Sequence, residues 1–252
     1  KIEEKFCETK FGKICYLEAG KGPKTLIFFH GLFGDPEGIK YLTAVLEPRG
    51  FRVIAPYLPG HGKSFGLPNK YGFAETVETL SDFVDAVCPS HFSLFGGSLG
   101  GGLAWGVAQK RKNRLEKLVL HTPLLKPIYL RDFPVAGLGL LRDWVFDQRD
   151  RLLGKGGAWP CAVRGRICKR TNILCLPKLL KIVSSAKLVP EGLENIGILF
   201  MWGESDHTNP YSNVSDFVTR AKGQIKFFPG GHFMFLRQFP KFLDSIVEYV
   251  SI

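Results

Sequence analysis

The chain has 252 residues, of which 45% are apolar and 23% charged, a balance typical of a globular protein with one large α/β domain or a domain carrying an insertion. No apolar run reaches the roughly 18 residues that a membrane-spanning helix needs. The six cysteines include no C-x-x-C pair, which argues against a disulfide framework or a zinc site. We therefore expect free structural thiols and a reducing, cytoplasmic compartment.

Apolar runs alternate with helix-like segments along most of the chain. Residues 4–9 and 13–18 alternate in polarity about Phe11-Gly12 and predict an antiparallel hairpin. Further strands are predicted at 25–29, 52–56, 91–94, 115–121, 196–202 and 224–228, and helices at 38–46, 73–87, 103–109, 214–221 and 239–250. This rhythm predicts an α/β fold, with a mostly parallel central sheet of about eight strands and helices on both faces.

The alternation of strands and helices stops between residues 123 and 194. This stretch has no buried strand, only amphipathic pieces at 138–152 and 176–187 joined by glycines and prolines, and it predicts a helical insertion. The core would then comprise residues 1–122 and 195–252. Cys161, Cys168 and Cys175 recur at intervals of seven and are expected to be structural thiols rather than metal ligands.

The same insertion is strongly basic. Between Pro123 and Pro190 there are thirteen basic and four acidic residues, which give this segment a net charge of +9 out of +11 for the whole chain. Such a surface could attract an anionic substrate or make peripheral contact with an anionic membrane, or it could be a solvated face with no partner. No motif supports binding to nucleic acid.

One glycine-rich stretch predicts a catalytic nucleophile. Gly96 and Gly100 flank Ser98 at two residues before and two after, between a predicted strand and a predicted helix. This is the G-x-S-x-G pattern of a nucleophile elbow, a turn so tight that its flanking residues must lack side chains. The alternative is a glycine-rich turn with an incidental serine.

A serine nucleophile needs a base and a group that orients the base. Asp206 follows the 196–202 strand and His232 follows the 224–228 strand, so both are expected at the end of the sheet where Ser98 lies. Glu204 is a rival acid. His30 and His61 are expected to be structural and to hydrogen-bond nearby backbone, whereas His91, His121 and His207 are interpreted as incidental.

Four segments in order resemble α/β-hydrolase-fold enzymes of the esterase and lipase type. They are His30-Gly31-Leu32-Phe33-Gly34, residues 58–64 (LPGHGKS), the GGSLGG elbow, and the pair formed by residues 202–206 with Gly231-His232. The resemblance implies a Ser98–His232–Asp206 triad and a cap formed by residues 123–194. It also implies an oxyanion hole from the backbone N–H of Leu99 and of Leu32, in preference to Phe33. Tyr57 departs from the family, since many relatives have an acid there.

The expected function is hydrolysis of small to medium carboxylic esters through an acyl-enzyme, with a small-molecule ester as partner and neither cofactor nor metal. Other acyl chemistry of the same triad stays open: monoacylglycerol lipase, thioesterase, lactonase, C–C hydrolase, acyltransferase or iminopeptidase activity. A non-catalytic ligand-binding relative is a further alternative. The acyl chain would contact apolar residues of the insertion, which could equally pack the insertion onto the core: Leu124, Leu125, Ile128, Tyr129, Phe133, Leu138, Leu141, Trp144 and Val145.

Overall fold

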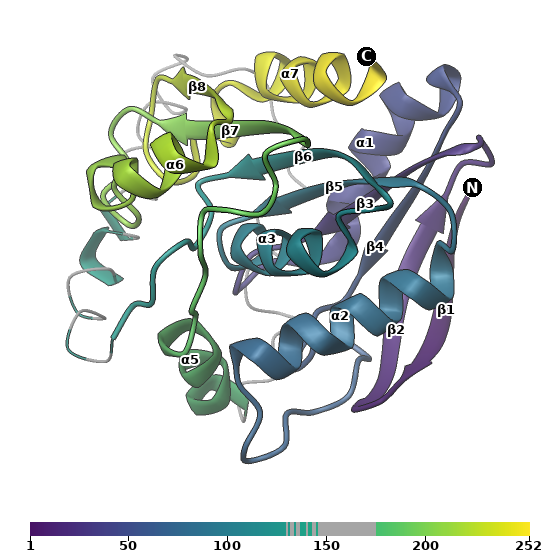
Figure 1. The fold of residues 1–252 in the computed structure, drawn as a ribbon, viewed down its shortest axis with the longest axis horizontal. Helices are drawn as coiled ribbons and strands as arrows, with labels where there is room; N and C mark the ends of the chain where they lie inside the picture. Colours follow the sequence, from purple (N-terminus) through teal and green to yellow (C-terminus); the bar gives the residue numbers. More distant parts are fainter. Residues whose placement is uncertain (130, 132–133, 135–136, 140, 143–144, 146–174) are drawn as a thin grey trace.

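A single eight-stranded sheet organises the molecule in the computed structural model, which describes residues 1–129, 131, 134, 137–139, 141–142, 145 and 175–252 (Figure 1). The spatial order of its strands is β1-β2-β4-β3-β5-β6-β7-β8. The strand bounds are β1 (Ile2–Thr9), β2 (Gly12–Ala19), β3 (Lys24–Phe29), β4 (Phe51–Pro56), β5 (Phe92–Gly97), β6 (Leu115–His121), β7 (Gly197–Gly203) and β8 (Gln224–Phe228).

The sheet is antiparallel only at its N-terminal edge. Strands β1 and β2 form the predicted hairpin, in which Thr9 pairs with Gly12, and β2 pairs antiparallel with β4. The strands from β4 to β8 all pair in parallel with their neighbours. Their carboxyl ends therefore meet at one edge of the sheet, where loops that carry functional side chains gather.

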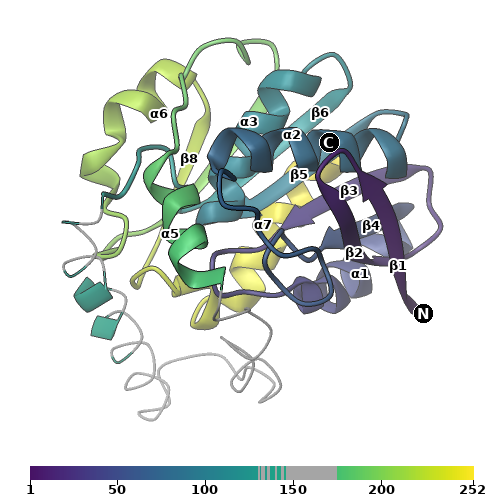
Figure 2. The ribbon, with the colours of Figure 1, turned by 90° about the horizontal axis from the view of Figure 1, so that it is seen from below.

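Helices cover both faces of this sheet. Helices α1 (Ile39–Leu46) and α7 (Phe239–Ser251) lie on one face, and α2 (Phe73–Val87), α3 (Leu99–Arg111) and α6 (Ser215–Ala221) lie on the other (Figures 1 and 2). Helix α5 (Leu176–Ser184) packs beside α2. Short 3-10 turns lie at Pro36–Gly38 (η1), Glu47–Arg49 (η2), Tyr211–Asn213 (η6) and Met234–Leu236 (η7).

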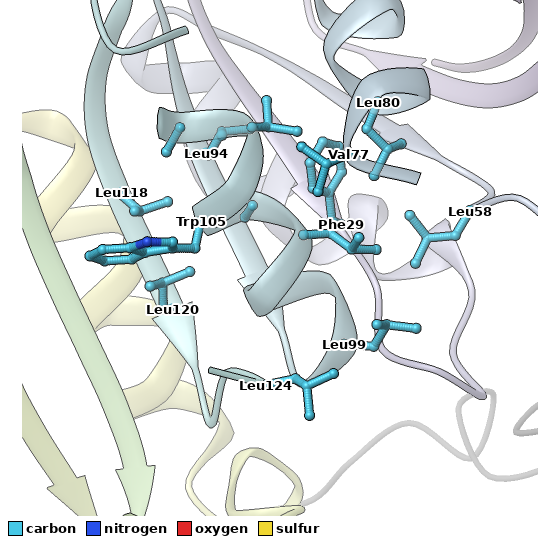
Figure 3. Close-up of a cluster of buried hydrophobic side chains, with 14 of the residues drawn as sticks. Phe29, Leu58, Val77, Leu80, Leu94, Leu99, Trp105, Leu118, Leu120 and Leu124 are labelled. Carbon is cyan, nitrogen blue, oxygen red and sulfur yellow. The ribbon is translucent and has the colours of Figure 1, made fainter. Parts of the chain in front are cut away.

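Each face of the sheet has its own apolar core. On the α2/α3 face, Trp105 is fully buried and its ring lies beside Leu118 and Leu120 of β6 (Figure 3). On the α1/α7 face, Phe95 of β5 stacks on Phe28 of β3, with ring centroids 5.1 Å apart. Because both faces of the central strands are covered, these strands are near-continuous apolar runs.

The predicted strands and core helices are present, with ends that shift by a few residues. The main shift is at α3, which begins at Leu99, directly after Ser98, rather than at residue 103. Within the predicted insertion, α5 is the helix expected at 176–187, whereas most of the 138–152 piece, Cys161 and Cys168 lie outside the described residues. The boundaries at 123 and 194 therefore stay a prediction. In the described part of the chain, no helix is both long and apolar enough to cross a membrane.

Candidate active site

The elbow at Ser98 is held in an unusual backbone conformation. Ser98 has φ 53°, a positive value that non-glycine residues seldom adopt. A Cβ on Gly96 would stand 2.4 Å from the Gly100 carbonyl oxygen, and one on Gly100 would stand 2.3 Å from the Phe29 carbonyl oxygen. Both glycines are therefore needed by close backbone approach, as the sequence pattern predicts.

Hydrogen bonds lock this turn from both sides. The Ser98 N–H donates to the His121 carbonyl at 2.8 Å, and the Ser98 carbonyl accepts from Gly101, Gly102 and Leu124. The strained residue thus has its backbone groups satisfied, and its half-buried side chain points out of the sheet edge toward the loops after β7 and β8. This is how a surrounding structure sustains backbone strain.

The three residues of the predicted triad come together in a hydrogen-bonded chain. The Ser98 Oγ lies 3.2 Å from His232 Nε2, and His232 Nδ1 lies 2.9 Å from Asp206 Oδ2. Because a carboxylate only accepts hydrogen bonds, Nδ1 carries the proton and Nε2 is free to accept the serine proton. The rival acid Glu204 is exposed, and His207 is exposed as well.

Asp206 is fixed by its own loop. Its Oδ1 accepts the backbone N–H of Thr208 at 3.0 Å and of Asn209 at 2.7 Å, which leaves Oδ2 for His232. Asn209 also donates its side-chain amide to the carbonyls of Thr122 and Pro123, and its own carbonyl accepts the Trp202 indole N–H. Asn209 therefore connects the acid to the end of β6, a role that the sequence pattern did not indicate.

The Gly31–Leu32 peptide is oriented by His30. The Gly31 carbonyl accepts from His30 Nδ1 at 2.7 Å and from the Gly34 N–H at 3.0 Å, while Leu58 N–H donates to His30 Nε2. Because the N–H and C=O of a trans peptide point in opposite directions, the Leu32 N–H faces away from these partners. A Cβ on Gly31 would stand 3.4 Å from Ser98 Cβ, so this peptide lies beside the nucleophile.

His61 supports the same loop. Its ring nitrogens face the carbonyls of Leu32 and Pro59, and its ring lies edge-on to His30 with centroids 4.9 Å apart. Burial lowers the pKa of His61, and burial together with His61 lowers the pKa of His30 to about 3. Both rings are therefore neutral at pH 7, and the prediction that they are structural residues bonded to backbone is confirmed.

Two amides in this region are available to a ligand. Leu99 is the first residue of α3, and within the described residues neither its N–H nor that of Leu32 donates to another protein group. The N–H groups of Gly101 and Gly102 are already taken by Ser98. Helix N-termini carry a partial positive charge, which favours a developing anion at this position.

A cavity of about 490 Å³ opens at Ser98. Leu32, Leu99 and His232 all line it, so the two amides and the hydrogen-bonded chain border one space. Most other lining side chains are apolar, and they come from both faces of the sheet. They include Phe28, Phe95, Leu124, Ile128, Leu180, Val183, Phe239, Phe242, Leu243 and Ile246.

The interpretation of His121 as incidental is wrong. His121 ends β6, is buried and lines the cavity, and its ring centroid lies 6.2 Å from that of His232. Its Nε2 has no partner within the described structure, and burial, followed by the charge of His232, lowers its pKa to about 3. The signal was its place at the end of a parallel strand next to the elbow strand.

The apolar wall predicted from the insertion is only partly found. Leu124 and Ile128 line the cavity, whereas Leu125 packs in the core and four other candidates, Tyr129, Leu138, Leu141 and Val145, are exposed. Phe133 and Trp144 lie outside the described residues. Four further residues of the wall come from α7, whose residues the sequence interpretation assigned only to a closing helix.

Comparison with known proteins agrees with this architecture. A sequence model of the α/β hydrolase fold family matches residues 24–148. The structure of this chain has the α/β hydrolase fold. The enol-lactonase from Burkholderia xenovorans superposes with a TM-score of 0.80 and 16% identity, covering 98% of this chain and 100% of that one.

Two curated relatives match shorter segments. A pimeloyl-[acyl-carrier protein] methyl ester esterase of Aromatoleum aromaticum is 36% identical over 95 residues, which are 38% of this chain and 35% of that protein. A 2-hydroxy-6-oxo-6-(2'-aminophenyl)hexa-2,4-dienoic acid hydrolase of Metapseudomonas resinovorans is 32% identical over 134 residues, 49% of this chain and 46% of that protein. The matched segments thus span less than half of either relative, and both relatives are hydrolases.

Proposed function

We propose that this protein is a serine hydrolase that cleaves carboxylic esters with apolar acyl groups. The observation that carries the proposal is the hydrogen-bonded chain from Asp206 through His232 to Ser98, together with a mainly apolar cavity that Ser98 and His232 line. A nucleophile, a base and a group that orients the base are the three parts that acyl transfer needs.

The reaction follows from these positions. Ser98 Oγ attacks the ester carbonyl carbon and gives its proton to His232 Nε2, while the carbonyl oxygen becomes an anion facing the N–H groups of Leu32 and Leu99. His232 then protonates the leaving alkoxide, and an acyl-Ser98 ester stays behind. Water attacks this ester, gives a proton to His232, and releases the carboxylic acid as Ser98 regains its proton.

Asp206 and His30 act through other groups in this scheme. Asp206 keeps the proton on Nδ1 and stabilises the imidazolium that forms when His232 takes the serine proton. His30 holds the Gly31–Leu32 peptide so that its N–H is already oriented before the anion forms. Loss of one such donor costs about 3 kcal/mol of transition-state stabilisation in other serine hydrolases.

The cavity favours a neutral substrate. The charged side chains that line it within the described structure are Asp35, Glu37 and Lys40, with no cluster of cationic groups that would bind a carboxylate. This argues for simple esters over the acidic substrates that C–C hydrolases such as the M. resinovorans relative act on. Thioester or lactone cleavage would use the same atoms and is distinguished by assay.

Labelling with a small fluorophosphonate tests the nucleophile. The wild-type protein should form a stable adduct on Ser98, detected by mass spectrometry of the peptide that contains it, and Ser98→Ala should form none. Ser93→Ala is the matched control, since Ser93 is buried in β5 away from the elbow. A wild-type protein that stays unlabelled would contradict the proposal.

Nitrophenyl esters then test the reaction. We expect turnover of acyl groups from two carbons upward, abolished by Ser98→Ala. A labelled enzyme that hydrolyses thioesters or lactones but none of these esters would refute the ester assignment while leaving the nucleophile intact.

A further inference from the structure

The cavity at Ser98 continues past the edge of the sheet. Leu124 and Val183, which line it, belong to the apolar core on the α2/α3 face, whereas Phe95, Phe242 and Ile246 belong to the core on the α1/α7 face. The empty space therefore passes beside the ends of the central strands and runs between the sheet and the two helices α1 and α7. We name this part of the cavity the α7 channel.

One stripe of α7 forms a wall of the channel. Its members follow the helical spacing i, i+3, i+4 and i+7: Phe239, Phe242, Leu243 and Ile246. At 1.5 Å per residue this stripe extends for about 10 Å along the helix. The stacked rings of Phe28 and Phe95 lie across from it on the sheet, so the channel is apolar on both sides.

The far end of the channel is buried. Ile246 is completely buried, and Leu42 of α1 is 4% exposed. The charged lining residues all lie between Asp35 and Lys40, in the loop and short turn before α1 and at its start. An apolar group that enters from Ser98 thus meets hydrocarbon and aromatic surface on the α7 and sheet sides of the channel, whereas the segment at the start of α1 adds Glu37 and Lys40.

We propose that the α7 channel holds an unbranched acyl chain of medium length, an inference that rests on the proposed ester hydrolysis. The acyl group stays bonded to Ser98 after the alcohol has left, so a channel with a buried end suits the acyl group, whereas the alcohol must depart through the opening. A saturated chain advances about 1.3 Å per bond, given its bond length and angle, so about 10 Å accommodates roughly eight methylenes.

A series of nitrophenyl esters with two to fourteen acyl carbons tests this. Each methylene that enters the channel should raise kcat/KM by about fourfold, and the rise should stop at about eight to ten carbons. Acetate esters of alcohols of increasing length form the second arm, in which we expect no such rise. A rise with alcohol length and none with acyl length would overturn the proposal.

Substitutions on α7 locate the chain. Ile246→Phe fills the far end and should shift the optimum to shorter acyl groups, and Leu243→Ala should extend it to longer ones. Val247→Phe is the matched control, because Val247 is buried in the same helix but does not line the cavity, and it should leave the optimum unchanged. Val183→Phe, at the α5 side, should lower kcat/KM for all lengths together.

The outcomes separate the two proposals. Labelling of Ser98 by a small fluorophosphonate shows that each variant keeps its folded site. If labelled Ile246→Phe and Leu243→Ala both keep the wild-type chain-length optimum, the channel proposal is wrong and the esterase proposal stands. If neither labelling nor turnover occurs in the wild-type protein, both fail.

Discussion

Two of the three histidines whose pKa is lowered by burial, His30 and His121, should make the stability of this protein fall in mild acid. His30 and His121 have pKa values of about 3 in the folded chain, against an ordinary value of 6.5, because burial disfavours their charged forms. The unfolded chain therefore binds protons between pH 6.5 and pH 3 that the folded chain does not bind. The contribution of each residue to stability is complete above pH 6.5 and is lost as the pH falls toward 3.

The size of the effect follows from these values. On lowering the pH from 7 to 5, each histidine should reduce the free energy of unfolding by about 2 kcal/mol, from 1.36 kcal/mol per pKa unit. His121→Phe removes one of the two groups, and phenylalanine suits the aromatic surroundings of Phe235 and Phe242. The variant should therefore lose about 2 kcal/mol less than the wild-type protein over this pH range.

Urea unfolding at pH 7 and pH 5, followed by fluorescence of the buried Trp105 and Trp202, measures the change in the free energy of unfolding between the two pH values for the wild-type protein and for the variant. Comparing each protein with itself cancels any packing change that the substitution brings. His91→Gln is the control, since His91 is exposed and its removal takes no buried group away. His232, whose ring centroid lies 6.2 Å from that of His121, is present in both proteins. An equal loss of stability in wild-type and His121→Phe protein would refute the reasoning.

Three further substitutions, the last with a matched control, test the site and the elbow. Asp206→Asn should lower kcat for ester hydrolysis by about 10⁴-fold with the thermal unfolding midpoint nearly unchanged, because the carboxylate sets the tautomer of His232; a loss under tenfold would contradict this role. Asn209→Ala removes the amide that donates to the carbonyls of Thr122 and Pro123, and should lower the free energy of unfolding in urea by about 1–3 kcal/mol. An unchanged urea midpoint would argue that Asn209 does not hold the Asp206 loop to the end of β6. Gly100→Ala should lower the free energy of unfolding by about 1–3 kcal/mol or more, because it forces a Cβ against the Phe29 carbonyl. Gly66→Ala is the control: a Cβ there would have no atom within 4 Å, so the free energy of unfolding should stay nearly unchanged.

The sheet and the hydrogen-bonded chain at Ser98 could be anticipated from sequence because each leaves a local signal. Buried parallel strands are short apolar runs, and the loops after them carry the functional side chains whatever the detailed packing. The glycines at 96 and 100 are required by backbone atoms a few residues away in the chain or one strand across. Asp206 and Glu204 lie in the same loop, so topology did not separate them and only the family resemblance favoured Asp206; the structure separates them by burial.

The place of His121 at the end of a strand is visible in the sequence, but the direction of its ring is not, because its environment is not local. A histidine at the end of an apolar strand has the same appearance in sequence whether its ring faces solvent, a core or a cavity. The rings of Phe235 and Phe242 that surround it come from segments more than a hundred residues later. The role of Asn209 is hidden for the same reason, since the carbonyls that it binds belong to the end of β6.

The position of the α7 channel is the least predictable feature, because the pattern that forms it is the pattern of ordinary core packing. An apolar stripe on a helix buries itself against whatever lies opposite, and only the spacing of α1, α7 and the sheet decides whether space is left between them. Phe242 and Ile246 are buried members of the α1/α7 core and at the same time line the space that continues from Ser98. A substitution there acts on two quantities together, the packing that stabilises the fold and the length of chain that fits. A comparison of stability alone or of activity alone would therefore confuse the two, and the chain-length optimum is the measurement that separates them.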